Sequence, residues 1–95
     1  MSPQPGRIDL RLTIPAAAPY HVVAGELARR FAEYSGAAAG AAAKLARAVE
    51  SLVGTLGTGA PDGSIALTME AREGELVVIA SAGARTEQAS CPLPA

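Results

Sequence analysis

The chain has 95 residues, enough for one domain of slightly less than average size. Its 8 Lys and Arg residues against 9 Asp and Glu residues argue against a nucleic-acid-binding protein, because such proteins carry a basic stripe. No apolar run reaches the roughly 18 residues that cross a bilayer, and the first residues lack a signal-peptide pattern, so we expect no membrane segment and a cytoplasmic location. Hydrophobic residues make up 49%, but 22 of them are Ala, which predicts one modest core.

The first predicted element is a strand. Residues 1–7 contain two prolines and a glycine, so we expect a flexible N-terminus there. From residue 8 to residue 14 apolar and polar residues alternate, which is typical of a strand with one apolar face, and Pro15 ends the pattern. The apolar face consists of Ile8, Leu10, Leu12 and Ile14.

Two helices are predicted next. An apolar stripe at helical spacing runs from about Tyr20 to Tyr34, and Gly36 follows as a C-terminal stop. A second helix is expected from about Ala38 to Leu56, because both its Ala-rich start and its apolar stripe favour a helix. The helical residues expected to face the sheet are Leu27, Phe31, Leu45, Val49 and Leu52.

Two further strands follow a glycine-rich loop at residues 57–63. Residues 65–72 alternate again, and residues 76–80 form a continuous apolar run. Glu73 and Gly74 between the two segments are typical of a tight hairpin.

These elements predict the fold class α+β. We expect a two-layer sandwich in the order β-α-α-β-β, with two helices on one face of a small, mostly antiparallel sheet. The single domain is expected over residues 8–83, and residues 84–95 are expected to form a loose C-terminal tail.

Few side chains point to chemistry. The only cysteine, Cys91, excludes an intramolecular disulfide and a cysteine metal cage, and it has no basic neighbour in sequence that would activate its thiol. The only histidine, His21, excludes a histidine cluster, and a structural role is favoured for it. We therefore predict no metal and no cofactor.

Three segments together resemble a known family. The opening strand reads DLRLTIPA, the second helix contains KLARAVESLVG, and the hairpin ends in VVIASAG. This layout, from Ile8 to Gly83, resembles the anti-sigma-factor serine kinases, which are small histidine-kinase-like members of the Bergerat-fold ATPase superfamily. The resemblance implies an ATPase-derived fold.

Departures from the family pattern fall at its nucleotide site. The family has a Glu and then an Asn that holds magnesium on the second helix; Glu50 matches the Glu, but Gly54 stands at the Asn position and offers no oxygen ligand. The family's Asp-x-Gly-x-Gly motif becomes Ser81, Gly83 and Arg85, with only its first Gly kept. The family's ATP lid and second Gly-rich box have no counterpart here. The resemblance thus implies a degenerate, truncated domain with no catalytic residue.

We expect a non-catalytic interaction or regulatory module of bacterial origin. By family analogy its partner is an anti-sigma antagonist, a sigma factor or a second copy of the chain. Two alternatives stay open: a residual nucleotide or small-ligand binding domain, with its pocket between Glu50 and residues 81–83, and an unrelated small α+β structural or interaction module.

The third predicted strand suggests an interface. It is apolar on both faces, but two helices cover only one of them, so an uncovered patch is expected around Val77 and Ile79. A two-fold dimer through this patch and the open edge of the strand would bury both. The alternative is that residues 84–95 fold back over the patch.

Overall fold

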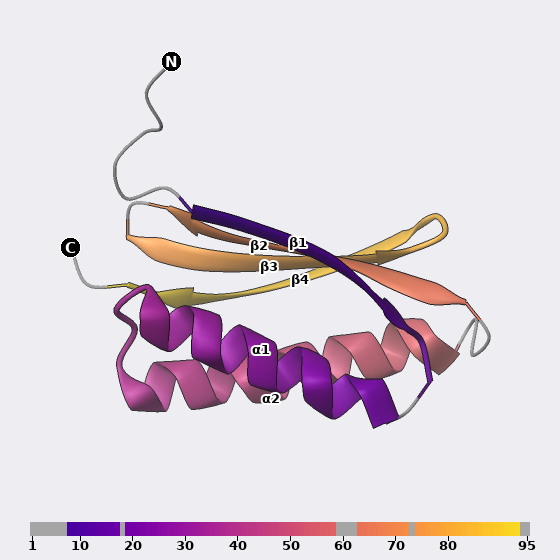
Figure 1. The fold of residues 1–95 in the computed structure, drawn as a ribbon, viewed down its shortest axis with the longest axis horizontal. Helices are drawn as coiled ribbons and strands as arrows, with labels where there is room; N and C mark the ends of the chain where they lie inside the picture. Colours follow the sequence, from indigo (N-terminus) through magenta and orange to yellow (C-terminus); the bar gives the residue numbers. More distant parts are fainter. Residues whose placement is uncertain (1–7, 18, 59–62, 73, 94–95) are drawn as a thin grey trace, which may run out of the picture.

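The computed structural model describes residues 8–17, 19–58, 63–72 and 74–93. The strands form one antiparallel sheet in the order β1-β2-β3-β4, and both helices cover the same face of it (Figure 1). The predicted α+β class and two-layer layout are confirmed, whereas the predicted flexible N-terminus lies outside the described residues. The elements are β1 (Ile8–Pro15), α1 (Pro19–Tyr34), α2 (Ala39–Thr58), β2 (Ser64–Arg72), β3 (Glu75–Ala82) and β4 (Arg85–Pro92).

The C-terminal segment differs from its prediction. Instead of a loose tail, residues 85–92 form β4, which pairs antiparallel with β3, so the sheet has four strands and not three. Gly83 opens the two-residue loop between them with a φ of 61°, and the following Ala84 has no positive φ; these are the φ signs of a type II′ hairpin turn. The strand was missed because only Ala89 and Cys91 of β4 are apolar and face the helices.

The turn between the helices forms as predicted at Gly36. Its φ of 101° is in the left-handed region that favours glycine. The Ala37 N–H donates to the Ala32 carbonyl at 2.9 Å, and the Gly36 N–H donates to the Glu33 carbonyl at 3.0 Å. This hydrogen-bond pair caps the end of α1 and reverses the chain into α2.

The two helices contribute differently to the core. On α2 the predicted Leu45 and Val49 are buried, and Leu52 packs partly against the core. On α1 the buried residues are small, and the predicted Leu27 and Phe31 are only partly buried against the same core. α1 therefore lies close to α2, and its Leu27 and Phe31 contact the core only in part. The buried residues of α1 are Ala24, Gly25, Ala28 and Ala32.

The sheet side of the core is centred on β2 and β3. Ile65, Leu67 and Met69 of β2 are fully buried, and they pair in register with residues of β1. On β1, however, burial decreases along the strand, from Ile14 at 5% exposed through half-buried Leu12 to Leu10 at 36% exposed. The end of β1 that carries Leu10 is thus the least covered part of the apolar face.

Candidate functional site

Glu50 and Gly54, the two helix residues of the site that the family resemblance led us to expect, lie in the contact between the helices. At Gly25 of α1, a Cβ atom would lie 2.5 Å from Glu50 Cγ and 2.9 Å from the Ala46 carbonyl oxygen, so Glu50 packs against the α1 backbone. At Gly54 the nearest group is the ring of His21, whose Nδ1 would lie 3.6 Å from a Cβ. Glu50 and Gly54 therefore both face α1.

The two hairpin residues of that site lie elsewhere. Side chains alternate along β3, and Val78 and Ala80 face the helices, so Ser81 faces the opposite side of the sheet. Gly83 lies in the exposed β3–β4 turn, with open space around its Cα. The sheet separates Ser81 from Glu50, and the structure does not bring the expected pocket residues together.

His21 connects the start of α1 to the preceding segment. Its Nε2–H donates to the Ala16 carbonyl at 3.0 Å in the tautomer that this bond requires. Gly57 of α2 leaves room for this arrangement, because a Cβ there would lie 2.8 Å from the Ala16 oxygen and 3.1 Å from His21 Nε2. The contact gives His21 a structural role, fastening the β1–α1 connection to the C-terminal end of α2.

Cys91 is buried against α2 at the opposite end of the helix layer. Burial raises the pKa of its thiol, which keeps it protonated and a poor nucleophile at neutral pH. An open groove of about 380 Å³ lies beside it, and among the described residues that line it Lys44 carries the charge. The other lining residues are Gly40, Ala41, Leu45, Ser90 and Pro92.

Neither a metal site nor a membrane span is evident within the described ranges. Their His, Cys, Asp and Glu side chains include no group of three or more that could hold a metal ion. Among the same residues, no helix combines the length and the apolar character needed to cross a bilayer.

The outer face of β3 differs from its prediction. Val77 is only 6% exposed and Ile79 is half-buried, although the helices lie on the other face. The register places Glu70 and Ser90 beside Val77, so its neighbours on β2 and β4 are polar. β4 occupies the predicted open edge of β3, and it extends the sheet in its plane rather than folding back over the patch. The third strand therefore offers no free edge.

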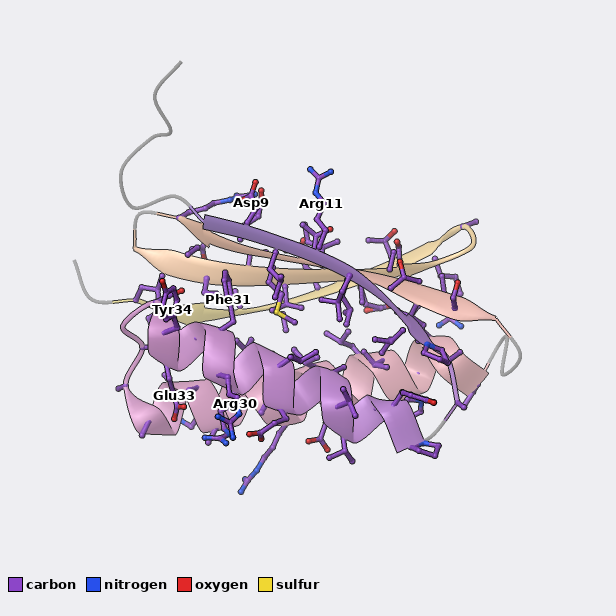
Figure 2. The ribbon with its side chains drawn as sticks, viewed as in Figure 1. Asp9, Arg11, Arg30, Phe31, Glu33 and Tyr34 are labelled. Atoms are coloured by element: carbon purple, nitrogen blue, oxygen red, sulfur yellow. The ribbon has the colours of Figure 1, made fainter. Side chains whose placement is uncertain are left out.

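Exposed apolar side chains gather instead around β1 and α1. All the large apolar residues that are more than about a third exposed, within the part of the chain that the structure describes, belong to these two elements. Figure 2 shows Phe31 pointing from α1 toward the sheet, with Tyr34 near it at the end of the helix. We call the β1/α1 surface the set Leu10, Leu12, Val23, Leu27, Phe31 and Tyr34.

This surface was missed by sequence reasoning because its residues were assigned to the core. The stripe of Val23, Leu27, Phe31 and Tyr34 does exist on α1, but Val23 is 45% and Tyr34 is 78% exposed. The buried stripe consists instead of Ala24, Ala28 and Ala32. Each of these follows a residue of the apolar stripe by one position, which is a rotation of about 100° around the helix. The regular spacing of those alanines was the signal that could have identified the true core face.

The backbone of β1 has unpaired groups along the edge that faces away from β2. The Ala16 N–H donates to the Gly63 carbonyl at 3.0 Å and continues the β1–β2 ladder. Backbone groups alternate in direction along an antiparallel strand, so those of Asp9, Arg11 and Thr13 point to the free edge. Pro15, which lacks an N–H, falls at a position of the same kind.

Two opposite charges lie along this edge. The side chains of Asp9 and Arg11 point away from the helices (Figure 2), and neither has an ion-pair partner among the described residues. Asp9 also lies directly opposite Glu70 in the β1–β2 register. Glu70 is paired with Arg72 on the same face, and Arg72 also acts on Asp9, so a cation of the chain itself already lies near these two carboxylates.

The charges on α1 are arranged differently, since they pair within the helix. Arg29 contacts Glu26 and also Glu33, the latter at 3.2 Å, while Arg30 contacts Glu26 at 2.9 Å. The hydrogen bond from Arg29, supported by Arg30, lowers the pKa of the Glu26 carboxyl. These solvent-facing pairs need no partner protein.

Neither a family model nor a curated protein matches the chain. The site is therefore defined by its geometry alone.

Proposed function

We propose that the chain is a non-catalytic protein-interaction module of bacterial regulation, with a fold derived from anti-sigma-factor-kinase-like ATPases. The observation that carries this proposal is the β1/α1 surface, where exposed apolar side chains lie beside an open strand edge. Exposed apolar patches and open edges are both features of protein interfaces. By the family resemblance the partner is an anti-sigma antagonist, a sigma factor or a second copy, and the proposed location is the cytoplasm.

The residual nucleotide-binding alternative has less support. Gly54 offers no ligand for magnesium, Glu50 packs against Gly25, and Ser81 is on the far side of the sheet. Calorimetric titration with ATP and magnesium is expected to give no binding heat, and a phosphate-release assay no hydrolysis. Micromolar magnesium-dependent binding that Glu50→Ala abolishes, and that Glu87→Ala on exposed β4 leaves intact, would overturn the proposal.

The unrelated α+β module is the other alternative, and gene neighbours separate it from the regulatory proposal. A sigma-factor gene or a phosphorylatable antagonist gene next to this one is expected. Purified candidates from such a neighbourhood can then be titrated against the chain. If none of them binds, the assignment to sigma-factor regulation fails, whereas an interaction role through the β1/α1 surface stays testable with other partners.

The surface itself is tested by a matched pair of substitutions. Tyr34→Ser removes an exposed apolar side chain from the β1/α1 surface, and Val22→Ser removes one from a different side of α1. Binding of a partner is expected to weaken at least about tenfold with Tyr34→Ser and to change little with Val22→Ser. Equal effects of the two substitutions would contradict the proposed location.

A further inference from the structure

The free edge of β1 has a sequence that can pair with itself. Asp9 and Arg11 alternate with Leu10, and their backbone groups point away from β2. We propose that two copies of the chain pair β1 with β1, antiparallel, about a two-fold axis at Leu10. The proposal deepens and rests on the proposed function, because it names a second copy as an occupant of the β1/α1 surface.

Face matching limits the possible registers. The helix-facing residues of β1 have even numbers and the outer residues odd numbers, so any register that keeps the helices of both copies on one side pairs odd with odd. An axis at Asp9 would place Asp9 opposite its own copy, and an axis at Arg11 would do the same for Arg11. Both bring like charges together across the new pair.

Of these three registers, only the one with its axis at Leu10 places opposite charges together. Asp9 then lies opposite Arg11 of the second copy, and symmetry repeats the pair on the other side of the axis. Because the backbone groups of both residues face the edge, each pair also forms a hydrogen-bonded position of the antiparallel ladder. The charges and the backbone therefore favour the same register.

The apolar side chains on the helix side fit this arrangement. Leu10, 36% exposed in the single chain, would lie opposite its own copy at a position where side chains come close. α1 lies below β1 and β2, so the two-fold axis also brings α1 beside α1 of the second copy (Figure 1). Phe31, which points from α1 toward the sheet, and the exposed Tyr34 at the end of the helix would then be covered together with Leu10 (Figure 2).

Charge exchange between two variants tests the register directly. Asp9→Arg places Arg opposite Arg11 in both pairs, and Arg11→Asp places Asp opposite Asp9, so each variant alone is expected to dimerise at least about tenfold more weakly than the wild type. A mixture restores two opposite-charge pairs, and the double variant Asp9→Arg/Arg11→Asp does the same within one chain. Sedimentation velocity over a concentration series measures all of these species.

Control variants keep the test specific. Arg85→Asp makes the same change of charge on exposed β4 and is expected to leave the dimer unchanged, and Ile79→Lys probes the outer face of the sheet. Far-UV circular dichroism is expected to show that all the charge variants keep the fold, because Asp9, Arg11 and Arg85 are exposed, and it checks the fold of Ile79→Lys, whose site is half-buried. High salt is expected to weaken the wild-type dimer and to leave less difference between wild type and variants.

Three outcomes would overturn the pairing. They are a wild type that sediments as a monomer up to several hundred micromolar, a mixture of the two variants that stays monomeric, and a dimer that Ile79→Lys abolishes but the charge variants do not change. None of these outcomes decides the proposed function. The proposed function fails separately, if the chain binds and hydrolyses ATP in the presence of magnesium. A monomer that binds another protein through Tyr34 would overturn the pairing but support the proposed function.

Discussion

β1 and β4 form the two free edges of the sheet, and the two strands differ in the charge of the side chains on their helix side. On the helix side of β4, Arg85 and Glu87 are charged and exposed, while Ala89 and Cys91 near the end of the strand pack against α2. On the helix side of β1, by contrast, the described side chains are Leu10, Leu12 and Ile14, and of these Leu10 is exposed. Charged side chains on the inward face of an edge strand are a known means of blocking edge-to-edge pairing.

The difference originates in how the two helices pack. α2 contributes large residues to the core, and it contacts β4 extensively. α1 instead buries the small residues Ala24, Ala28 and Ala32, and this brings the helices close but leaves Leu27 and Phe31 only partly buried. One edge is thus covered by its own chain, whereas the other keeps exposed apolar area.

The largest effect is expected under the closed edge. Leu45 is 1% exposed and lies beside Cys91, so Leu45→Ala removes fully buried atoms and leaves a cavity. We expect a loss of about 2–5 kcal/mol in the free energy of unfolding, measured by urea denaturation. Since a small domain has about 5–15 kcal/mol in total, the variant is expected to be partly unfolded at 37 °C. A loss below about 1 kcal/mol would show that the β4 side is not the better packed one.

A smaller effect is expected for Phe31→Ala under the open edge. Phe31 is only half-buried in the single chain, so about half the cost of a buried aromatic residue, roughly 1–3 kcal/mol, is expected. A second effect is expected because Phe31 lies under the edge that is proposed to pair. The melting temperature of the wild type is expected to rise with protein concentration, and the melting temperature of Phe31→Ala is expected to rise less. Leu45→Ala provides the control, because its loss should not depend on association. If the melting temperatures of the wild type and Phe31→Ala rise equally with protein concentration, Phe31 does not contribute to association at the β1 edge.

The close approach of the helices is tested by two glycines. In Gly25→Ala the new methyl group would overlap Glu50 Cγ and approach the Ala46 carbonyl, so the helices must separate, at a cost of about 1–3 kcal/mol that better helix propensity offsets by up to about 1 kcal/mol. In Gly54→Ala the methyl group would lie 3.6 Å from His21 Nδ1, an ordinary contact, so a gain of about 0.5–1 kcal/mol is expected. Thermal melts of the pair measure the contrast. A Gly25→Ala variant that gains as much as Gly54→Ala would show that α1 is not held close by its small residues.

Local patterns in the sequence were sufficient for most of the fold. The alternation in residues 8–14, the stop at Gly36 and the hairpin that joins β2 to β3 each depend on neighbouring residues, and each formed as predicted. β4 was missed because its residues are mostly polar, although Gly83 followed by Ala84 is a hairpin signal of its own. Which strand becomes an edge depends on pairing between distant segments, and the sequence of one strand does not show it.

The candidate site was harder to predict than the fold. The expected pocket required Glu50 and Ser81 to share a side of the sheet, but Ser81 has the same parity as Val77 and Ile79. Those two had been assigned to the face without helices, so parity alone would have separated Ser81 from the helix layer. The exposure of Tyr34 could have been predicted from the spacing of Ala24, Ala28 and Ala32, whereas that of Leu10 depends on contacts between distant segments.

We expect the smallest effect on stability for Glu87→Val on β4. This substitution is also the most specific test of the difference between the two edges. Glu87 is exposed, so its substitution should change the free energy of unfolding by no more than about 0.5 kcal/mol. It removes an inward-facing charge from the closed edge and leaves that edge more like β1. With both edges able to pair, the chain is expected to form species larger than a dimer, which light scattering after gel filtration detects. Glu87→Gln is the matched control, since it keeps a polar side chain and should keep the closed edge. If Glu87→Val remains as small as the wild type at several hundred micromolar, the charge on β4 is not what closes that edge, and the geometry of the Cys91 end against α2 must close it instead.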